Sequence, residues 1–474
     1  MFGPAHANAL AYLALIGFIP VAFFVFRSWP PATAAVALLL GADMLLPADL
    51  EIDLPGLPRL GKDALSFLTV FVCLLVYQPR RIAAARPFRS IELLGVVLAL
   101  GGIATVFLNS DPLRYGPMVV PAMSPEEAPT AALLDLLTYA VPFLLGRVLV
   151  RDGRGLERLL AAWATAGLLY SLLCLVEIRL SPQLHYWVYG YYQFAFDQSF
   201  RWGGFRPVVF MSEGLATAIF MASALIAAAT LARARIPVLR LSARPVMAYL
   251  AVLLVACKSL AAIVTGLASI ASLALPPRWV ARIALVGCLL ATLYPALRLA
   301  DLVPTQEIVQ LAETTSDPIR ARSLAGRLES EAKQLDKARE RLLFGWGTNA
   351  RNWVFDPVNG ESMIQPDGYW ILRLGSRGLV GFAASFGLCL VPVVLAWARL
   401  GRVERRRDRT LLVGLMLIIA IRMVDWIPNG RWTSLPVFLG GGLYGSVQAL
   451  TVARSRRPAH ATPTPLSSDR RART

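Results

Sequence analysis

Charged residues are scarce in this chain. Of its 474 residues, 16% are Asp, Glu, Lys or Arg and 56% are hydrophobic, and the mean hydropathy is +0.57. Soluble domains have about 25% charged and about 45–50% apolar residues, so this composition excludes an ordinary soluble protein. An integral membrane protein is predicted instead.

Histidine and cysteine are also rare. The three histidines, His6, His185 and His460, are too few for a histidine-rich metal site, and His185, between aromatic residues, is predicted to lie at the membrane interface. No metal and no other cofactor is expected. The five cysteines lie in or beside apolar runs without metal-ligand spacing and are predicted to be small buried residues rather than disulfides: Cys73, Cys174, Cys257, Cys288 and Cys389.

Positive charge, in contrast, is abundant. The formal net charge is +17, and the basic residues gather in short loops at 80–89, 151–158, 233–244 and 399–409. Short basic loops stay on the cytoplasmic side of a membrane. Topology therefore explains the charge, and nucleic-acid binding is not expected.

Apolar runs recur along the chain, and a helix needs roughly 20 apolar residues to cross a bilayer. The N-terminus has neither a basic stretch nor a small-residue cleavage site, so the first run is predicted to be a retained span. Residues 454–474, rich in Pro, Ser, Thr and Arg, are predicted to form a disordered cytoplasmic tail after a single transmembrane domain of residues 1–453. The candidate spans are 10–26, 31–46, 64–77, 91–108, 131–150, 159–180, 208–231, 246–275, 283–299, 371–397, 411–426 and 435–452.

One of these runs is too long for a single upright span. Residues 246–275 hold about 30 residues, or roughly 45 Å of helix, and the basic loops on either side need an even number of crossings between them. A hairpin of two short helices with Lys258 at its outer tip satisfies both constraints. The sequence thus predicts an all-α, polytopic membrane helix bundle of about 12–14 spans.

Two long polar segments are predicted to face the periplasm, at 181–206 and, as a large loop, at 301–369. Within the large loop, Leu324, Leu328, Leu335 and Leu342 recur at offsets that suit one face of a helix. An amphipathic helix over 319–343 that lies on the membrane is therefore expected.

Basic residues in these outer segments run against the positive-inside tendency. Guanidinium groups donate paired hydrogen bonds and stay ionised, which suits a diphosphate, so these residues are candidates for substrate binding. The alternative is that each arginine reaches toward lipid headgroups, but binding is favoured for Arg201, Arg206 and Arg327 as a group. The candidates are Arg201, Arg206, Lys258, Arg320, Arg322 and Arg327.

Few carboxylates accompany these basic residues. Asp367 precedes an apolar run and is either the N-cap of a helix or a functional group. Glu177 and Glu213 lie near the outer ends of their spans, and Glu213 is a further candidate for substrate binding. Arg422 and Asp425 are one helical turn apart and are predicted to form an internal ion pair.

The stretch LLFGWGTNARNW, followed by DGYWILRLGSRGLVGF, resembles the hallmark of the superfamily of O-antigen ligases and Wzy-type polysaccharide polymerases. Gly345 and Gly347 of LLFGWGTNARNW match its G-x-G turn, and Gly378 to Gly381 of DGYWILRLGSRGLVGF match its Gly-Leu-Ile-Gly at the same offset from Asp367. FRWGGFRP resembles its R-x-x-G-x-F segment, SLAGRLESE its S-x-x-x-R, and ACKSLAAIV its hairpin tip. The resemblance covers most of the chain from about residue 133 to 441 and rests on the order of these motifs.

This resemblance implies a GT-C-like fold in the bacterial inner membrane and a glycosyltransferase that needs neither a metal nor a nucleotide sugar. Its substrates would be glycans linked to undecaprenyl diphosphate, as donor and as acceptor. Besides the bilayer, a flippase and chain-length or export proteins would be partners. The chemistry proposed for the family is an inverting displacement, in which a base takes the acceptor proton while arginines stabilise the departing diphosphate. The resemblance implies Asp367 and Arg327 as catalytic residues.

Asp367 departs from the family pattern, because ligases have a histidine at this position. A carboxylate can also serve as the base, and the Asp-Gly-x-Trp of this chain resembles some polymerase-like sequences of exopolysaccharide clusters. The departure therefore weakens the ligase hypothesis more than the polymerase hypothesis. A polymerase of exopolysaccharide or O-antigen is therefore favoured. The alternatives are a ligase of the same fold and a non-enzymatic glycolipid transporter, in which polar groups are expected at the membrane midplane rather than at the outer ends of spans.

Overall fold

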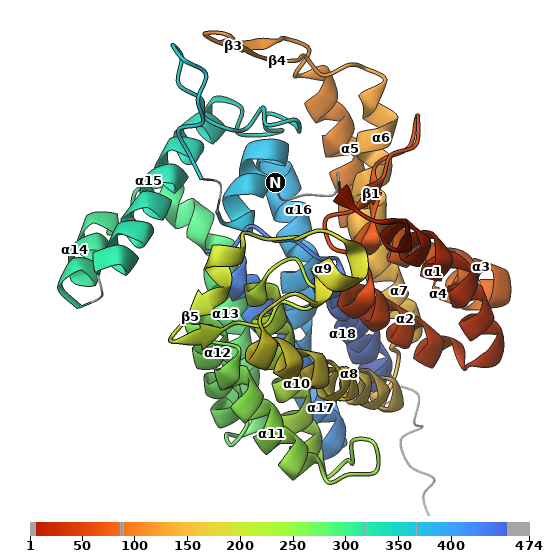
Figure 1. The fold of residues 1–474 in the computed structure, drawn as a ribbon. Coiled ribbons are helices and arrows are strands. Elements are labelled where there is room, and N and C mark those ends of the chain that lie inside the picture. The colour runs from red at the N-terminus through yellow and green to blue at the C-terminus, as the bar shows by residue number, and fades with distance from the viewer. Residues whose placement is uncertain (1–5, 86, 88–89, 316–317, 366, 453–474) are drawn as a thin grey trace, which may run out of the picture.

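The computed structural model describes residues 6–85, 87, 90–315, 318–365 and 367–452. Within these residues helices dominate, and strands occur only as three short antiparallel hairpins. The all-α class predicted from the sequence is confirmed. Most helices stand together in one bundle, from which α14 and α15 project to one side (Figure 1).

Six of the described segments are long and apolar enough to cross a membrane. A bent pair, α3 (Lys62–Tyr77) and α4 (Pro79–Ala85), makes a seventh if it counts as one span; its two helices meet at 102°. The polytopic membrane bundle is thus confirmed, whereas the total of about 12–14 spans stays a prediction. The six are α1 (Ala9–Ser28), α6 to α7 (Glu127–Asp135 and Val141–Leu149, joined by the π-helical turn Leu136–Ala140), α8 (Gly153–Leu180), α10 (Gly214–Ala234), α13 (Pro277–Leu299) and α16 (Tyr369–Arg399, extended by Leu400–Arg402).

Shorter helices complete the bundle. Two of them, α11 and α12, form the hairpin predicted for residues 246–275, which breaks at Lys258. The φ of Lys258 is 53°, in the left-handed region that reverses the chain direction. The shorter helices are α2 (Pro31–Leu45), α5 (Leu93–Phe107), α11 (Ala243–Ala256), α12 (Leu260–Ser272), α17 (Arg406–Asp425) and α18 (Leu435–Val452).

Helix α10 is the most deeply buried of the six, with 83% of its most apolar stretch enclosed. It contacts α8, α11, α12 and α17. A Cβ atom at Gly167 of α8 would lie 2.4 Å from the Cβ atom of Ala224, and a Cβ atom at Gly414 of α17 would lie 2.2 Å from Oγ1 of Thr230. Small residues let membrane helices approach this closely, which makes α10 the centre of the bundle.

Short helices and hairpins lie at the ends of the bundle. The large loop predicted at 301–369 contains α14 (Thr305–Thr315), which was not predicted, and α15 (Pro318–Glu340), which matches the amphipathic helix expected over 319–343. Helix α15 buries Leu335 and Ala338 and contacts α16, so part of its apolar face packs on protein. The hairpins are β1 (Glu51–Ile52) with β2 (Leu60–Gly61), β3 (Leu113–Tyr115) with β4 (Met118–Val120), and β5 (Phe200–Arg201) with β6 (Gly204–Phe205); α9 (Leu184–Tyr189) and a 3-10 turn (Phe196–Ser199) precede the last.

Two further predictions concern the interior and the tail. All five cysteines are buried free thiols, as their apolar surroundings predicted. The tail predicted at 454–474 lies outside the described residues.

Candidate functional site

A cavity of about 1120 Å³ lies where the two segments predicted to be outer loops meet the ends of the helices. Its walls come from the segment 198–215, the α11–α12 turn, α15, the start of α16 and the connection after α17. Five of the lining residues are arginines and two are carboxylates, so the cavity is electropositive. They are Arg201, Arg206, Arg322, Arg327, Arg431, Glu213 and Asp367.

Most of the predicted site residues meet in this cavity, although they come from separate segments of the chain. Lys258 is not among the lining residues. Its Nζ lies 3.5 Å from the Trp202 carbonyl, so it supports the β5–β6 hairpin that carries Arg201. The side chain of Arg320 lies outside the described part of the structure. The predicted residues that line the cavity are Arg201, Arg206, Glu213, Arg322, Arg327 and Asp367.

Arg431 was not predicted as a site residue. It lies in the short connection between α17 and α18, and its guanidinium is 3.1 Å from Asp49 and 4.0 Å from Glu213. The span before it begins at the basic loop 399–409, which is predicted to be cytoplasmic, so Arg431 lies at the end of α17 that is predicted to face outward. The same positive-inside argument that selected the other arginines would therefore have identified it.

Asp367 lies at the edge of the cavity and caps no helix. Its Oδ2 atom is 3.1 Å from Nε of Arg327, yet this buried oxygen accepts no hydrogen bond from the described residues. Helix α16 has Gly368 at its N-cap and no side-chain cap, and its first two amides donate to the carbonyls of Asn429 and Trp426 at 2.8 and 3.4 Å. The N-cap interpretation is therefore wrong.

Two glycine motifs allow the segment that follows α15 to pack closely against α16. Gly378 has φ 63° and ψ −167°, which interrupts the helix, and the two amides after it donate to the carbonyls of residues 342 and 343 at 2.7 and 3.2 Å. A Cβ atom on Gly345 would lie 2.6 Å from the amide nitrogen of Arg377. The close approach that these glycines permit fixes the chain on both sides of Asp367.

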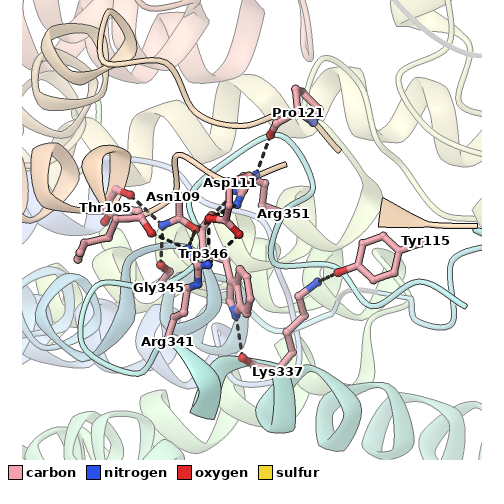
Figure 2. A network of polar contacts seen from close by, with 11 residues as sticks. Thr105, Asn109, Asp111, Tyr115, Pro121, Lys337, Arg341, Gly345, Trp346 and Arg351 are labelled. Carbon is pink, nitrogen blue, oxygen red and sulfur yellow. Dashed lines mark hydrogen bonds and ion pairs between the residues drawn. The ribbon is translucent and has the colours of Figure 1, made fainter. Parts of the chain in front are cut away.

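A buried polar network anchors the same segment to α5 and the connection after it (Figure 2). Asn109 donates to the Gly345 carbonyl at 3.0 Å, and Arg341 pairs with Asp111 at 3.0 Å. Arg351 is fully buried and donates to two backbone carbonyls at 2.9 and 2.7 Å. Because these groups hold one another, the network acts as a scaffold for the loop.

Arg206 is the most enclosed of the cavity's arginines, with 7% of its surface exposed. Burial and the neighbouring Arg201 lower its pKa to about 10, while Glu213 acts in the opposite direction, so the group stays protonated at neutral pH. Its Nε atom makes no hydrogen bond with the described residues. A buried donor without a partner costs about 1–3 kcal/mol, and more for a charged group. This atom lies against Gly214, where a Cβ atom would be 2.6 Å from it.

Glu177 fixes the backbone between Arg206 and Glu213. Its carboxylate accepts hydrogen bonds from the amides of Val208 and Val209 at 2.8 and 2.7 Å. This carboxylate is thereby occupied and buried, and it positions the arginine rather than facing the cavity.

His185 is buried inside the segment between α8 and β5, and its location at the membrane interface stays a prediction. Its Nε2 atom accepts from the amide of Ala48 at 3.2 Å, and Nδ1 donates to the carbonyl of Tyr191 at 3.0 Å. Burial lowers the pKa of His185 to about 4. The imidazole is therefore neutral and fully engaged, which excludes it as a base for the cavity.

A second, smaller cavity of about 260 Å³ adjoins the first, and the two share Glu213, Asn429 and Arg431 as lining residues. Arg422 and Asp425 also line it. The ion pair predicted between them is wrong: the side chain of Asn429 donates to Asp425 at 2.8 Å, and Nε and Nη2 of Arg422 have no hydrogen-bond partner among the described residues.

Comparisons with known proteins add no family to this picture. No protein-family model matches the chain, and no curated protein matches it. Among the described residues, no group of three or more His, Cys, Asp or Glu side chains is placed to hold a metal ion. The function is therefore inferred from the arrangement of the arginines and of Asp367, the carboxylate that caps no helix.

Proposed function

We propose that this protein polymerises oligosaccharide repeat units linked to undecaprenyl diphosphate into exopolysaccharide or O-antigen, at the periplasmic face of the bacterial inner membrane. The observation that carries the proposal is one cavity, at the ends of apolar helices, lined by five arginines and by the carboxylate of Asp367, which caps no helix. A lipid diphosphate has its anionic group at this level, with its chain in the bilayer and its glycan outside.

The arginines act on the donor. Guanidinium groups stay ionised and donate paired hydrogen bonds that match phosphate oxygens. Arg206, the most enclosed arginine of the cavity, and Arg327, on α15, stabilise the negative charge that develops on the departing diphosphate. Such stabilisation is most effective in an enclosed site whose donors are already in place.

Asp367 acts on the acceptor. The acceptor hydroxyl oxygen forms a bond to the anomeric carbon of the donor while its proton passes to the Asp367 carboxylate. The bond between the anomeric carbon and the diphosphate oxygen breaks, and its electron pair leaves with undecaprenyl diphosphate. Attack and departure take place on opposite faces of the ring, so the configuration inverts. A general base of this kind accelerates a reaction by about 100- to 10,000-fold.

The ion pair between Arg327 and Asp367 links donor binding to base catalysis. Its side chains are 46% and 29% exposed, and such pairs contribute only about 0–1 kcal/mol. A diphosphate offers Arg327 a stronger, bidentate partner. Donor binding therefore releases Asp367, so that the base becomes available only when a donor is in place.

A ligase of the same fold would use the same cavity with another acceptor, and a transporter would move the glycolipid unchanged. Deleting the gene and analysing the lipid-linked glycan separates these functions. A polymerase predicts single repeat units that accumulate on the carrier and are accessible from the periplasm. Full-length polymer left on the carrier would indicate a ligase, and single units held on the cytoplasmic side would indicate a transporter; either result would overturn the proposal.

A further inference from the structure

We infer that a separate cavity, called here the lipid cavity, binds the phosphate headgroup of an anionic phospholipid from the inner leaflet of the membrane. It has a volume of about 400 Å³ and is lined by α4, α7, α16, α18 and the connection after α7. Asp367 precedes the first residue of α16, whereas Arg399, in the lipid cavity, is the last residue of this helix. The inference does not depend on the proposed function, because the two sites lie at opposite ends of α16.

Three arginines from different segments converge on the lipid cavity. Arg147 lies in the last turn of α7, Arg151 in the connection after it, and Arg399 at the end of α16. The described residues that line the cavity include no carboxylate. Burial lowers the pKa of Arg151, and the positive charges of Arg147 and Arg81 act in the same direction. An anion between these arginines would offset both their repulsion and their burial.

The three guanidinium groups keep hydrogen-bond donors that a ligand can reach. Arg399 is partly exposed and makes no hydrogen bond or ion pair with the described residues. Arg151 uses only Nη2, which donates to the carbonyl of Arg81 at 3.1 Å. Arg147 pairs with Glu92 through Nη1, and 14% of its side chain is exposed. None of the remaining nitrogens is a buried atom without a partner, so these donors have accessible surface in the cavity.

Small residues open the space that the arginines surround. Ala84 and Ala85 of α4 line the lipid cavity, as do Gly445 and Ala449 of α18. A Cβ atom on Gly445 would lie 2.7 Å from the carbonyl oxygen of Arg147, so α18 packs closely on the end of α7. Larger side chains at these positions would fill the cavity. The small apolar surface that remains suits the glycerol backbone of a lipid whose phosphate contacts the arginines.

The lipid cavity lies where phospholipid headgroups are expected. Helix α4 turns by 102° from α3, so it runs nearly perpendicular to that apolar helix. Tyr77, the last residue of α3, and Trp397, two residues before Arg399, are 36% and 42% exposed. Tyr and Trp gather at membrane–water interfaces, and the basic loops at this end are predicted to face the cytoplasm. Basic cavities between helices on this face bind the headgroups of anionic lipids.

The positive-inside tendency explains which side of the membrane the arginines occupy, but it does not explain their convergence. Arginines that serve topology alone can extend separately toward water or toward lipid headgroups. A free phosphate ion would use the same donors as a lipid phosphate. The apolar surface of the cavity and the exposed aromatic residues beside it favour a phosphate that belongs to a lipid.

The test is a titration of the full-length protein, purified in detergent, with phosphatidylglycerol, in which native mass spectrometry counts the bound lipid. The wild type should bind one phosphatidylglycerol more tightly than phosphatidylcholine with the same acyl chains, and an excess of inorganic phosphate should not displace it. Removal of each arginine should weaken binding about fivefold. Arg399→Gln loses no contact with the described residues, and the double variant Arg151→Gln with Arg399→Gln should bind about 25-fold more weakly if the effects add.

The matched control removes two charges from the same predicted face of the membrane. Arg278, at the start of α13, and Arg402, just after α16, are both exposed and do not line the lipid cavity. The double variant Arg278→Gln with Arg402→Gln has the same net charge as the test variant and should bind phosphatidylglycerol as the wild type does.

Each outcome decides one part of the inference. Equal affinity for phosphatidylcholine, or displacement by inorganic phosphate, would refute recognition of an anionic lipid. Unchanged binding in the test variant, or an equal loss in the control, would show that the lipid cavity is not the site. If the double test variant fails to fold, Arg399→Gln decides alone. Binding is measured without polymer formation, so the result stands whether or not the proposed function is correct.

Discussion

Replacing Asp367 by Asn distinguishes a catalytic role of this carboxylate from a role in stabilising the protein. Asn keeps the size of the side chain but does not take up a proton at neutral pH. Asp367 caps no helix, so the variant loses only the ion pair with Arg327, whose side chains are 46% and 29% exposed. Such a pair contributes about 0–1 kcal/mol. The amount of protein in the membrane and its melting temperature should therefore stay close to those of the wild type.

The activity of the same variant should nearly disappear. Loss of a general base costs about 100- to 10,000-fold in rate, which is about 2.7–5.5 kcal/mol in activation free energy. This loss is several times larger than the contribution of the ion pair. The assay is the initial rate of polymer formation by purified protein, with lipid-linked repeat units collected from the deletion strain. The value of kcat should fall while KM changes little.

Asp336→Asn is the matched control for this experiment. Asp336 is another acid of the large loop that pairs with an arginine, Arg339 at 2.8 Å, but it does not line the cavity. This control should keep full activity, and Asp367→Ser should be as inactive as Asp367→Asn. A rate within about threefold of the wild type for either Asp367 variant, less than 1 kcal/mol, would remove Asp367 from the mechanism. Glu213 would then be the next candidate base.

Arg206→Lys keeps the charge but loses the planar guanidinium, so the rate of polymer formation should fall about tenfold or more. The control Arg158→Lys, near the start of α8 and outside the cavity lining, should have no effect. Full activity in Arg206→Lys would show that charge alone suffices. Lys258→Cys and Glu340→Cys should react with an impermeant thiol reagent after the outer membrane is permeabilised, since both positions are predicted to face the periplasm. The five native cysteines are buried and should give little background labelling. Protection of position 340 would refute the periplasmic placement. The pKa of His185 is about 4 in the folded protein and about 6.5 when unfolded, so stability that is present above pH 6.5 should be lost as the pH falls toward 4, by about 3 kcal/mol at most. His185→Gln should reduce the difference between melting temperatures at pH 7 and pH 5, and an unchanged difference would contradict this assignment.

The hairpin at Lys258 and the electropositive cavity were predictable because both depend on rules that apply along the chain. A run of about 30 apolar residues is too long for one upright span, and the parity of the basic loops then requires a turn within it. Arginines at the outer ends of spans contradict the positive-inside tendency, which indicates that they have another role. Both arguments can be made without information on which segments are in contact. The structure adds that Arg206 and Arg327 line the same cavity.

The errors concern groups whose partners come from distant parts of the chain. The position of Asp367 before a helix left an N-cap open as an alternative to a functional role, but the amides at the start of α16 donate to the carbonyls of Asn429 and Trp426. Arg422 and Asp425 are spaced for an ion pair, but Asn429 donates to Asp425. Spacing within one helix determines which groups can meet, whereas tertiary contacts determine which of them do.

If the protein acts as proposed, the charge of the cavity favours a carboxylate at position 367 over a histidine, which is the residue that ligases have in the superfamily that the motifs of this chain resemble. A histidine base becomes a cation when it takes the acceptor proton, and Nε of Arg327 lies 3.1 Å from Oδ2 of Asp367. A partly exposed ion pair of this kind contributes about 0–1 kcal/mol, so a carboxylate is modestly stabilised beside Arg327 before the donor binds, whereas a protonated histidine is not. A carboxylate becomes neutral in the same step, and the five arginines keep their charge for the departing diphosphate. On the proposed function, a carboxylate at position 367 therefore suits this cavity, because it pairs with Arg327 before the donor binds and loses its charge when it takes the acceptor proton.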